Sequence, residues 1–215
     1  MPTPAPITIY QCPKCKTIYK KNICNRFPST RTTFFSDSVS GIPRIPNITR
    51  CENCGLILSF RDLKPFDYYF NRRESISKYE NAEFTKILDI YNYIEALKFF
   101  PENEKSLRLE IWHGFNDRIR ENKELSNNEN AKKLFINEND KKIWKENCEM
   151  LINLLDFDNL NEKIMIAELH RNLGNFDKSM EIIHSFSEDL DILKKQFIEK
   201  ILKKDRCVFV RELWE

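Results

Sequence analysis

Four cysteines form two short pairs in the first quarter of the chain. Each pair has two residues between its members, giving Cys12 and Cys15 in the first and Cys51 and Cys54 in the second. Two intervening residues allow one tight turn to direct both thiolates at the same ion, and two such turns complete a tetrahedral set of four sulfurs. The spacing therefore predicts a Zn²⁺ site whose ligands are Cys12, Cys15, Cys51 and Cys54.

A site with four thiolate ligands has no open coordination position, so the spacing predicts a structural zinc ion and not a catalytic one. Thirty-five residues separate Cys15 from Cys51. A zinc ribbon usually has about 15–20, and an inserted hairpin would explain the difference. Two alternatives stay open: unrelated reduced cysteine pairs, or a redox-active pair. The redox alternative is weaker because no βαβ pattern surrounds either pair.

Three further cysteines make the total odd. Cys24 lies close enough to the first pair to replace one ligand, although a small buried thiol is the favoured interpretation. Cys148 and Cys207 lie far from both pairs, and we interpret them as ordinary packed thiols.

The elements that position these residues differ between the two parts of the chain. Seven of the nine prolines precede residue 65, and β-branched and aromatic residues flank both cysteine pairs, which favours short strands over helices there. After residue 65 the pattern is helical, with expected helices at 82–99, 103–121, 139–156, 161–173, 176–186 and 189–204. The stretch 122–138 is polar and predicts a loop, and residues 207–210 predict a strand that packs back on the head. The sequence thus predicts an α+β fold with a small β-rich zinc-ribbon-like domain, 1–64, followed by a mainly helical domain, 65–215.

One helical hairpin, at residues 164–183, carries a more specific pattern. Ala167 and Ser179 are small positions at which two helices can approach, Gly174 makes the turn between them, and Phe176 covers that turn. This pattern resembles one tetratricopeptide repeat (TPR). Residues 94–103 are similar to the end of a second repeat, although three full repeats do not align.

A cysteine-paired head joined to a TPR-like helical domain resembles an uncharacterised group of bacterial cytosolic proteins. That resemblance implies a non-catalytic zinc-binding adaptor that mediates protein–protein interaction through its helical domain. It does not indicate which protein is the partner.

The charge is divided unevenly between the two parts. Residues 1–64 contain ten basic and three acidic side chains, a formal charge of +7, which leaves −5 for the remainder. A four-thiolate zinc site would lower the head to about +5. Between the cysteine pairs, arginines and aromatic residues could contact phosphates and stack on bases. The alternative function is therefore an RNA- or DNA-binding protein, associated with translation or transcription, that uses Arg26, Arg31, Arg44 and Arg50. If the aromatic residues instead form the small core of the head, which is the slightly favoured interpretation, the same arginines would contact an acidic protein partner.

Several classes of function are disfavoured by what the sequence contains. Its four glycines lie apart, which argues against phosphate-binding loops. The three histidines, His113, His170 and His184, match no metalloprotease or triad motif, and the carboxylates lie among lysines as expected for solvated helix faces. An enzyme is therefore the less favoured interpretation. With neither a secretory signal nor about 18 consecutive apolar residues, the expected location is the cytoplasm, without membrane insertion.

Overall fold

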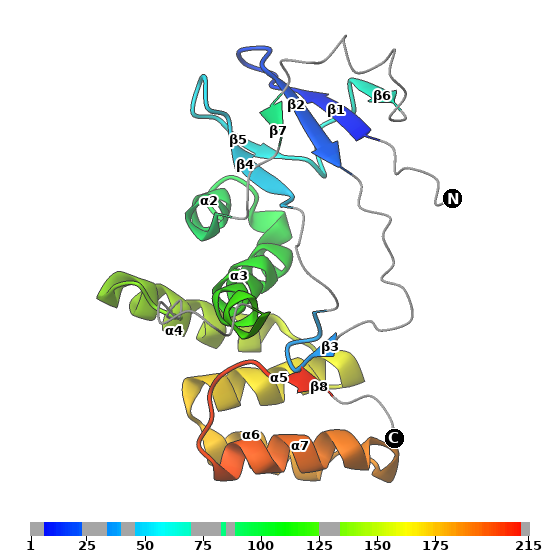
Figure 1. The fold of residues 1–215 in the computed structure, drawn as a ribbon, viewed down its shortest axis with the longest axis vertical. Helices are drawn as coiled ribbons and strands as arrows, with labels where there is room; N and C mark the ends of the chain where they lie inside the picture. The colour runs from blue at the N-terminus through cyan, green and yellow to red at the C-terminus, as the bar shows by residue number, and fades with distance from the viewer. Residues whose placement is uncertain are drawn as a thin grey trace. The chain divides into compact units, whose positions relative to one another are not determined.

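The computed structural model describes residues 7–22, 34–39, 46–69, 83–84, 89–124 and 134–211. The backbone divides into two units, each built from two stretches of the chain. Unit 1 comprises residues 1–31 and 42–102, and unit 2 comprises residues 32–41 and 103–215. The fold is α+β: short strands lie mainly near the N-terminus, and six α-helices follow within the described residues (Figure 1).

These units differ from the predicted division after residue 64 in two respects. Residues 65–102 belong to unit 1, because two of its strands and one of its helices come from this stretch. Residues 34–39, predicted to lie in the head, belong to unit 2, because their strand pairs with the C-terminal strand of the described chain. The long interval between the cysteine pairs therefore holds a segment of the helical unit.

Unit 1 contains two small sheets and one helix. The larger sheet has the strand order β6-β1-β2-β7, with β1 antiparallel to both β2 and β6, and β2 parallel to β7. The smaller sheet is the antiparallel pair β4–β5. The strand bounds are Ile7–Gln11 (β1), Ile18–Asn22 (β2), Ile48–Arg50 (β4), Ile57–Ser59 (β5), Asp67–Tyr69 (β6) and Glu83–Phe84 (β7).

Helix α2, Ile90–Ala96, packs against β4 and begins later than the predicted span 82–99. Asp89 has extended backbone angles, and its side chain accepts a hydrogen bond from the Tyr91 amide at 2.9 Å, which fixes the N-terminus of the helix. The first part of the predicted span instead includes β7. The buried Tyr93 hydroxyl accepts a hydrogen bond from the Asn47 amide at 2.9 Å and thereby attaches α2 to the start of β4.

Unit 2 is mainly helical, and each helix packs on the next one along the chain, from α3 through α7. Figure 1 shows α5, α6 and α7 lying side by side. Each helix from α3 to α7 contributes side chains to the core of unit 2. The fully buried ones include Trp112, Phe115, Leu151, Leu169, Ile183 and Phe197. The bounds are Glu104–Glu124 (α3), Glu138–Leu154 (α4), Leu160–Leu173 (α5), Phe176–His184 (α6) and Asp191–Leu202 (α7), with 3₁₀ turns at Pro101–Asn103 and Glu188–Leu190. Five of the six predicted helices thus lie close to observed ones, although α3 extends into the stretch expected to be a loop.

The C-terminal strand of the described chain closes unit 2. Strand β8, Val210–Arg211, pairs in antiparallel fashion with β3, Phe34–Phe35. A strand is therefore present near the predicted residues 207–210, although it covers residues 210–211. Its partner strand comes from the first 64 residues, as predicted. That partner nevertheless belongs to the helical unit. Within the described residues, none of the helices combines the length and apolar character needed to cross a membrane.

The turn between α5 and α6 has the geometry that the hairpin pattern predicts. Gly174 has a φ of +86°, in the left-handed region that ends many helices. Ser179 is buried in α6, and its hydroxyl donates a hydrogen bond to the Ala167 carbonyl of α5 at 2.8 Å. Two small residues therefore allow these helices to approach closely at this point.

Replacing Gly174 with alanine should destabilise unit 2. Left-handed backbone costs an alanine about 1–2 kcal/mol, and the new Cβ would overlap the guanidinium of Arg206. The guanidinium is the far end of a flexible side chain and can move aside, so we expect the loss of unfolding free energy in urea, followed by circular dichroism, to be about the backbone cost alone. In an Arg206→Ala background the same substitution should cost a similar amount. A much larger loss in the native background than in the Arg206→Ala background would show that the guanidinium cannot move aside.

Candidate metal centre

The two cysteine pairs lie on two hairpins with the same backbone construction. In the β1–β2 hairpin, the Cys12 amide donates to the Thr17 carbonyl at 2.8 Å, and the Lys16 amide donates to the Cys12 carbonyl at 3.0 Å. In the β4–β5 hairpin, Cys51 makes the corresponding two bonds, with Leu56 and Gly55, both at 2.8 Å. The same tight turn is therefore built twice, and each turn presents two sulfurs.

The residue after the second cysteine of each pair has a left-handed conformation. Its φ is +67° at Lys16 and +73° at Gly55. Glycine adopts this conformation without strain, whereas at Lys16 a residue with a side chain adopts it at some cost in energy. The repeated turn therefore depends on hydrogen bonding around the first cysteine of each pair more than on glycine.

The four sulfur atoms form one cluster, all within 4.8 Å of one another. Two close approaches join the two hairpins: Cys12 Sγ lies 3.6 Å from Cys54 Sγ, and Cys15 Sγ lies 3.4 Å from Cys51 Sγ. Tetrahedral bonds of about 2.3 Å to a central ion require sulfur–sulfur separations of about 3.8 Å, whereas a disulfide requires about 2.05 Å. The geometry therefore fits four ligands around one metal ion and does not fit disulfide bonds.

The cluster is part of the hydrophobic core of unit 1. The Cys12 and Cys51 side chains are fully buried, whereas Cys15 and Cys54 are partly exposed. Three aromatic residues pack in the same core, Tyr10, Tyr19 and Phe60, and the rings of Tyr10 and Phe60 lie 4.8 Å apart. A metal ion held here would therefore join the two hairpins through the interior of the unit.

The protein itself favours ionisation of part of the cluster. A hydrogen bond from the Thr17 hydroxyl, 3.1 Å from Cys15 Sγ, lowers the pKa of Cys15 to about 6. Burial raises the pKa of Cys51, but hydrogen bonds to its sulfur outweigh burial and leave the pKa below the ordinary thiol value. A backbone hydrogen bond from Leu56 lowers the pKa of Cys54, yet burial and the neighbouring thiols raise it overall to about 12. The remaining protons would be displaced by a bound cation, because metal ligands must be thiolates.

Sequence reasoning missed the contribution of Tyr19. This residue is buried in β2, and its hydroxyl donates a hydrogen bond to the Cys51 thiolate, which lowers the pKa of Cys51. The same hydroxyl accepts a hydrogen bond from the Glu52 amide at 3.2 Å. A signal was present in the sequence, because a tyrosine four residues after Cys15 lies on the strand that leaves the first turn.

The arginines predicted to contact nucleic acid or a partner are only partly covered by the structure. Arg26, Arg31 and Arg44 lie outside the described residues, as does Cys24. Arg50 is at the end of β4, where its guanidinium forms an ion pair with Glu95 of α2 and donates to the Gly55 carbonyl at 3.2 Å. The positive charge of Arg50 is thus already paired with Glu95 within unit 1.

A second group of buried polar residues, in unit 2, was not predicted. The Asp37 carboxylate accepts hydrogen bonds from Arg120 at 2.5 Å and Asn116 at 2.7 Å, and all three side chains are buried. His113 Nε2 lies 3.2 Å from the Asp37 carbonyl oxygen. Burial raises the pKa of Asp37, but the positive charges of His113 and Arg120 outweigh it and hold the pKa below the ordinary value.

Glu168 of α5 is the centre of a related network. Its carboxylate accepts hydrogen bonds from Ser36 at 2.7 Å and from Arg171 at 2.9 Å. Arg171 also donates to the Cys207 carbonyl at 2.7 Å, and Asn172 donates to the Arg206 carbonyl at the same distance. The expectation that the carboxylates lie on solvated faces is therefore wrong for Glu168. Each charge has a partner, so the network attaches residues 34–39 and the C-terminal segment to α3 and α5.

The structure also describes Cys148 and His170, two further residues that the sequence analysis considered. Cys148 is fully buried in α4, and burial raises its pKa well above the ordinary value, as expected of a packed thiol. Within the described part of the chain, the four-cysteine cluster is the single group of histidine, cysteine and acidic side chains arranged to hold a metal ion. His170 of α5 is half-buried, and burial lowers its pKa.

Comparison of the chain with protein-family models, with curated proteins and with solved structures gave no match in any of the three. The functional argument therefore rests on the geometry of the cysteine cluster and of the helical unit.

Proposed function

We propose that the protein is a non-catalytic adaptor in which a structural zinc ion holds unit 1 together and the chain binds a protein partner. The observation that carries this proposal is the cluster of four sulfurs on two matching turns. Zinc is the ion we assign because it accepts four thiolates in tetrahedral geometry without redox chemistry. Cys12, Cys15, Cys51 and Cys54 would fill its coordination shell, which leaves no position for water or substrate.

The helical unit supports the adaptor part of the proposal. Helices α3 to α7 pack each on its successor, which is the arrangement of repeat proteins, where consecutive helices form extended binding surfaces. The close approach of α5 and α6 at Ala167 and Ser179 is similar to that within a TPR. A TPR-like scaffold of this kind binds proteins or peptides more often than it performs chemistry.

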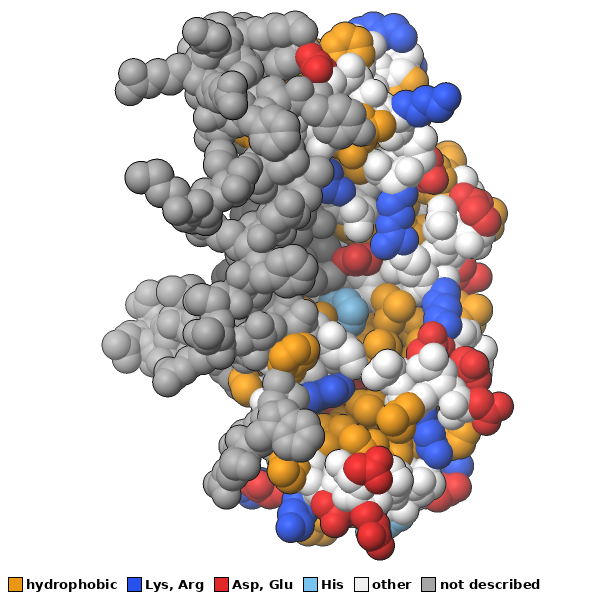
Figure 2. Space-filling view, turned by 90° about the vertical axis from the view of Figure 1, so that its right-hand side faces the viewer, with side chains coloured by type: hydrophobic (Ala, Val, Ile, Leu, Met, Phe, Trp, Pro, Cys, Tyr) orange, Lys and Arg blue, Asp and Glu red, His pale blue; other side chains and the backbone are white. Residues whose placement is uncertain are grey.

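The nucleic-acid alternative has less support from the described residues. Arg50 is paired with Glu95, so binding phosphate with it would require breaking an existing ion pair. Basic and acidic side chains alternate over the described part of the face in Figure 2, without one continuous basic surface there. A phosphate backbone is usually bound by a basic patch or stripe.

One set of measurements on the full chain tests the proposal. Native mass spectrometry should find one zinc ion per chain, and a mobility-shift assay with single-stranded RNA and DNA should show no complex at low salt. A protein purified without stoichiometric zinc, even after zinc is added back, would contradict the structural ion. Nucleic-acid binding that weakens about 10³-fold or more between about 50 and 200 mM salt would instead favour the alternative function.

A further inference from the structure

The four sulfurs of the candidate metal centre differ in their access to solvent. The first cysteine of each turn is fully buried, whereas the second is partly exposed. Both close approaches between the hairpins join one sulfur of each kind. The partly exposed Cys54 lies 3.6 Å from the buried Cys12, and the partly exposed Cys15 lies 3.4 Å from the buried Cys51. Each accessible sulfur therefore has a second sulfur in contact with it on the other hairpin.

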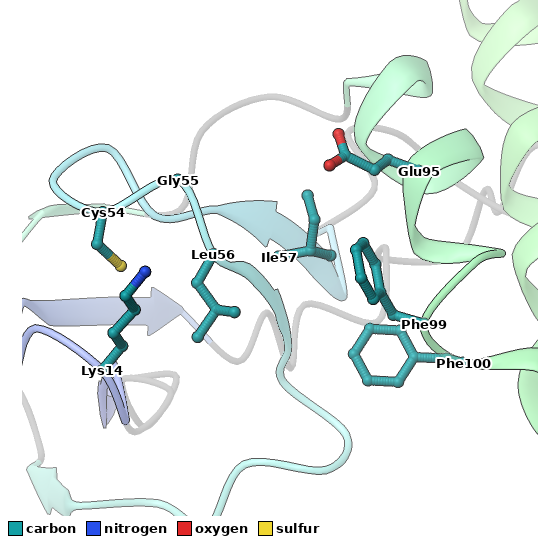
Figure 3. Close-up of a pocket in the computed structure, with 8 residues that line it drawn as sticks. All are labelled: Lys14, Cys54, Gly55, Leu56, Ile57, Glu95, Phe99 and Phe100. Atoms are coloured by element: carbon teal, nitrogen blue, oxygen red, sulfur yellow. The ribbon is translucent and has the colours of Figure 1, made fainter.

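Cys54 also borders a pocket, which none of the other three cysteines of the cluster lines. The pocket has a volume of about 320 Å³ and lies between the second cysteine turn and the end of α2. At one end the Lys14 ammonium points toward the Cys54 sulfur, and the rings of Phe99 and Phe100 lie on the other side (Figure 3). A small solute in this pocket therefore reaches the Cys54 sulfur next to a positive charge.

These surroundings are those of a cysteine that reacts with oxidants. Reactive cysteines are thiolates that are partly exposed and close to a positive charge, and redox-sensing ones have a second cysteine within reach. Without the metal, burial and the neighbouring thiols outweigh the hydrogen bond from Leu56 and raise the pKa of Cys54 to about 12. Zinc deprotonates its thiol ligands, so Cys54 is a thiolate in the loaded cluster. Exposure, Lys14 and Cys12 supply the other conditions.

We propose that Cys54 and Cys12 are a peroxide-sensitive pair, whose oxidation to a disulfide releases the zinc ion. In the first step the Cys54 thiolate attacks one oxygen of hydrogen peroxide. The S–O bond forms, the O–O bond breaks, and hydroxide leaves beside the Lys14 ammonium, whose charge stabilises it. In the second step the Cys12 thiolate attacks the sulfur of the Cys54 sulfenic acid, which forms the S–S bond and releases a second hydroxide. Each hydroxide takes a proton from the solvent, so two thiolates lose two electrons and one peroxide becomes two waters.

The new bond would replace the metal as the link between the two hairpins. Only Cys15 and Cys51 remain as ligands, which is half of the coordination shell, so the zinc ion leaves. Forming a bond of about 2.05 Å from the observed separation of 3.6 Å requires a shift of about 1.5 Å. The proposal rests on the zinc site of the proposed function and gives the adaptor a reversible control, because thiols reduce disulfides by exchange.

The first test identifies the bond in the zinc-loaded full chain. Hydrogen peroxide is added in excess, zinc release is followed with a chromogenic chelator, and free thiols are blocked with N-ethylmaleimide at half release. Trypsin and a glutamate-specific protease cleave after Lys14, Lys16, Arg50 and Glu52, which places the four cysteines on four separate peptides. Mass spectrometry should find Cys12 linked to Cys54, with one bond for each zinc ion released. Dithiothreitol and added zinc should restore the starting state.

Two lysines of the first turn provide matched variants. The Lys14 ammonium points toward Cys54 (Figure 3), whereas the Lys16 ammonium donates to the Pro13 carbonyl at 3.1 Å. Lys14→Met should slow zinc release about threefold or more, which is less than the loss of a buried oxyanion donor because solvent screens the charge. Lys16→Met should leave the rate unchanged. Dimedone, which traps sulfenic acids, should label Cys54 and not Cys15.

Several results would overturn the proposal. They are a bond from Cys54 to any cysteine other than Cys12, a Cys15–Cys51 bond that forms first, dimedone on Cys15, equal rates in the two lysine variants, and zinc retained in excess peroxide. Zinc content measured before the peroxide is added separates this failure from failure of the metal centre. A chain that holds one zinc ion and resists peroxide refutes the peroxide-sensitive pair alone, whereas a chain without zinc refutes the metal centre itself.

Discussion

The double substitution Cys12→Ser/Cys51→Ser is expected to abolish metal binding and to unfold unit 1. Both side chains are fully buried in its core, and each lies on a different hairpin, so the ion would lose one ligand from each. Structural zinc contributes about 10–16 kcal/mol to folding in zinc-finger peptides, which equals or exceeds the total stability of about 5–15 kcal/mol of an ordinary domain. The small sheets of unit 1 cannot compensate for a loss of that size.

Hydrogen exchange resolved by peptide gives the readout. In the double variant, peptides covering residues 7–22 and 46–60 should exchange at the rate of unfolded chain, whereas those covering α5 to α7 should stay protected. The matched control is Cys207→Ser, which changes a partly exposed thiol of unit 2 outside the cluster and should retain one zinc ion and full protection. Protection of residues 7–22 in the double variant, with zinc absent, would show that unit 1 folds without the ion.

The second large effect is expected from Arg120→Met in unit 2. Arg120 and Asp37 form an ion pair in which both side chains have no exposure to solvent. Removing one member of a buried pair costs about 3–5 kcal/mol, because the remaining charge is buried without its partner. Asn116 still donates a hydrogen bond to Asp37 in this variant, and His113 still lowers the pKa of Asp37, but the direct ion pair with Arg120 is lost.

The dependence on pH separates this effect from simple loss of packing. In the native chain the pKa of Asp37 is held below its ordinary value, so its contribution to stability is present above about pH 4 and is lost as the pH falls below that value. In Arg120→Met burial still raises the pKa of Asp37 while only His113 and Asn116 lower it, so that pKa should be higher than in the native chain and the folded state should take up a proton at a higher pH. The deficit of the variant should therefore shrink as the pH falls from about 7 to 5.

Urea unfolding of unit 2 at several pH values measures both quantities. The double variant Asp37→Asn/Arg120→Met, which removes the charge as well as its partner, should recover part of the stability and should lose the pH dependence. A single variant whose deficit is the same at pH 7 and pH 5 would contradict the assignment of a buried carboxylate that has lost its ion-pair partner.

The candidate metal site was predictable from the sequence because ligand spacing is a local property. Two residues between cysteines constrain one turn, and the sulfurs then meet wherever two such turns share a core. The helices of unit 2 were predictable for a similar reason, since their apolar periodicity and caps, such as Asn159 and Gly174, lie within each segment. The observed ends of α3 and α4 differ from the predicted ends by a few residues, because helix ends depend on capping and fray easily.

The features that sequence reasoning missed depend on distant contacts. Strand β3 has only two residues, which is too short to show the alternation of apolar and polar residues that predicts a strand. It is a strand because β8 pairs with it. In the sequence, Glu168 and Arg171 have the spacing of an ion pair on a solvated helix surface. In the structure, residues 34–39 and 205–211 cover them. The start of α2 was misplaced because the apolar residues before Asp89 fit a helical pattern, although strand pairing of β7 with β2 takes part of that stretch.

The pairing of β3 with β8 also determines the order in which the chain can fold during synthesis. All four cysteines are present once Cys54 has emerged, and both turns are complete two residues later, at Leu56. The Phe209 amide that donates to the Ser36 hydroxyl, in contrast, lies 173 residues after that hydroxyl. At about 5–20 residues per second, the ribosome needs about 8–30 s to advance from Cys54 to Arg211. Throughout that interval the two phenylalanines of β3 lack their partner strand, so the nascent chain carries an unpaired apolar edge that chaperones could bind. Early closure of the metal site would restrict this segment to a tethered loop between Cys15 and Cys51, which limits its reach toward other chains.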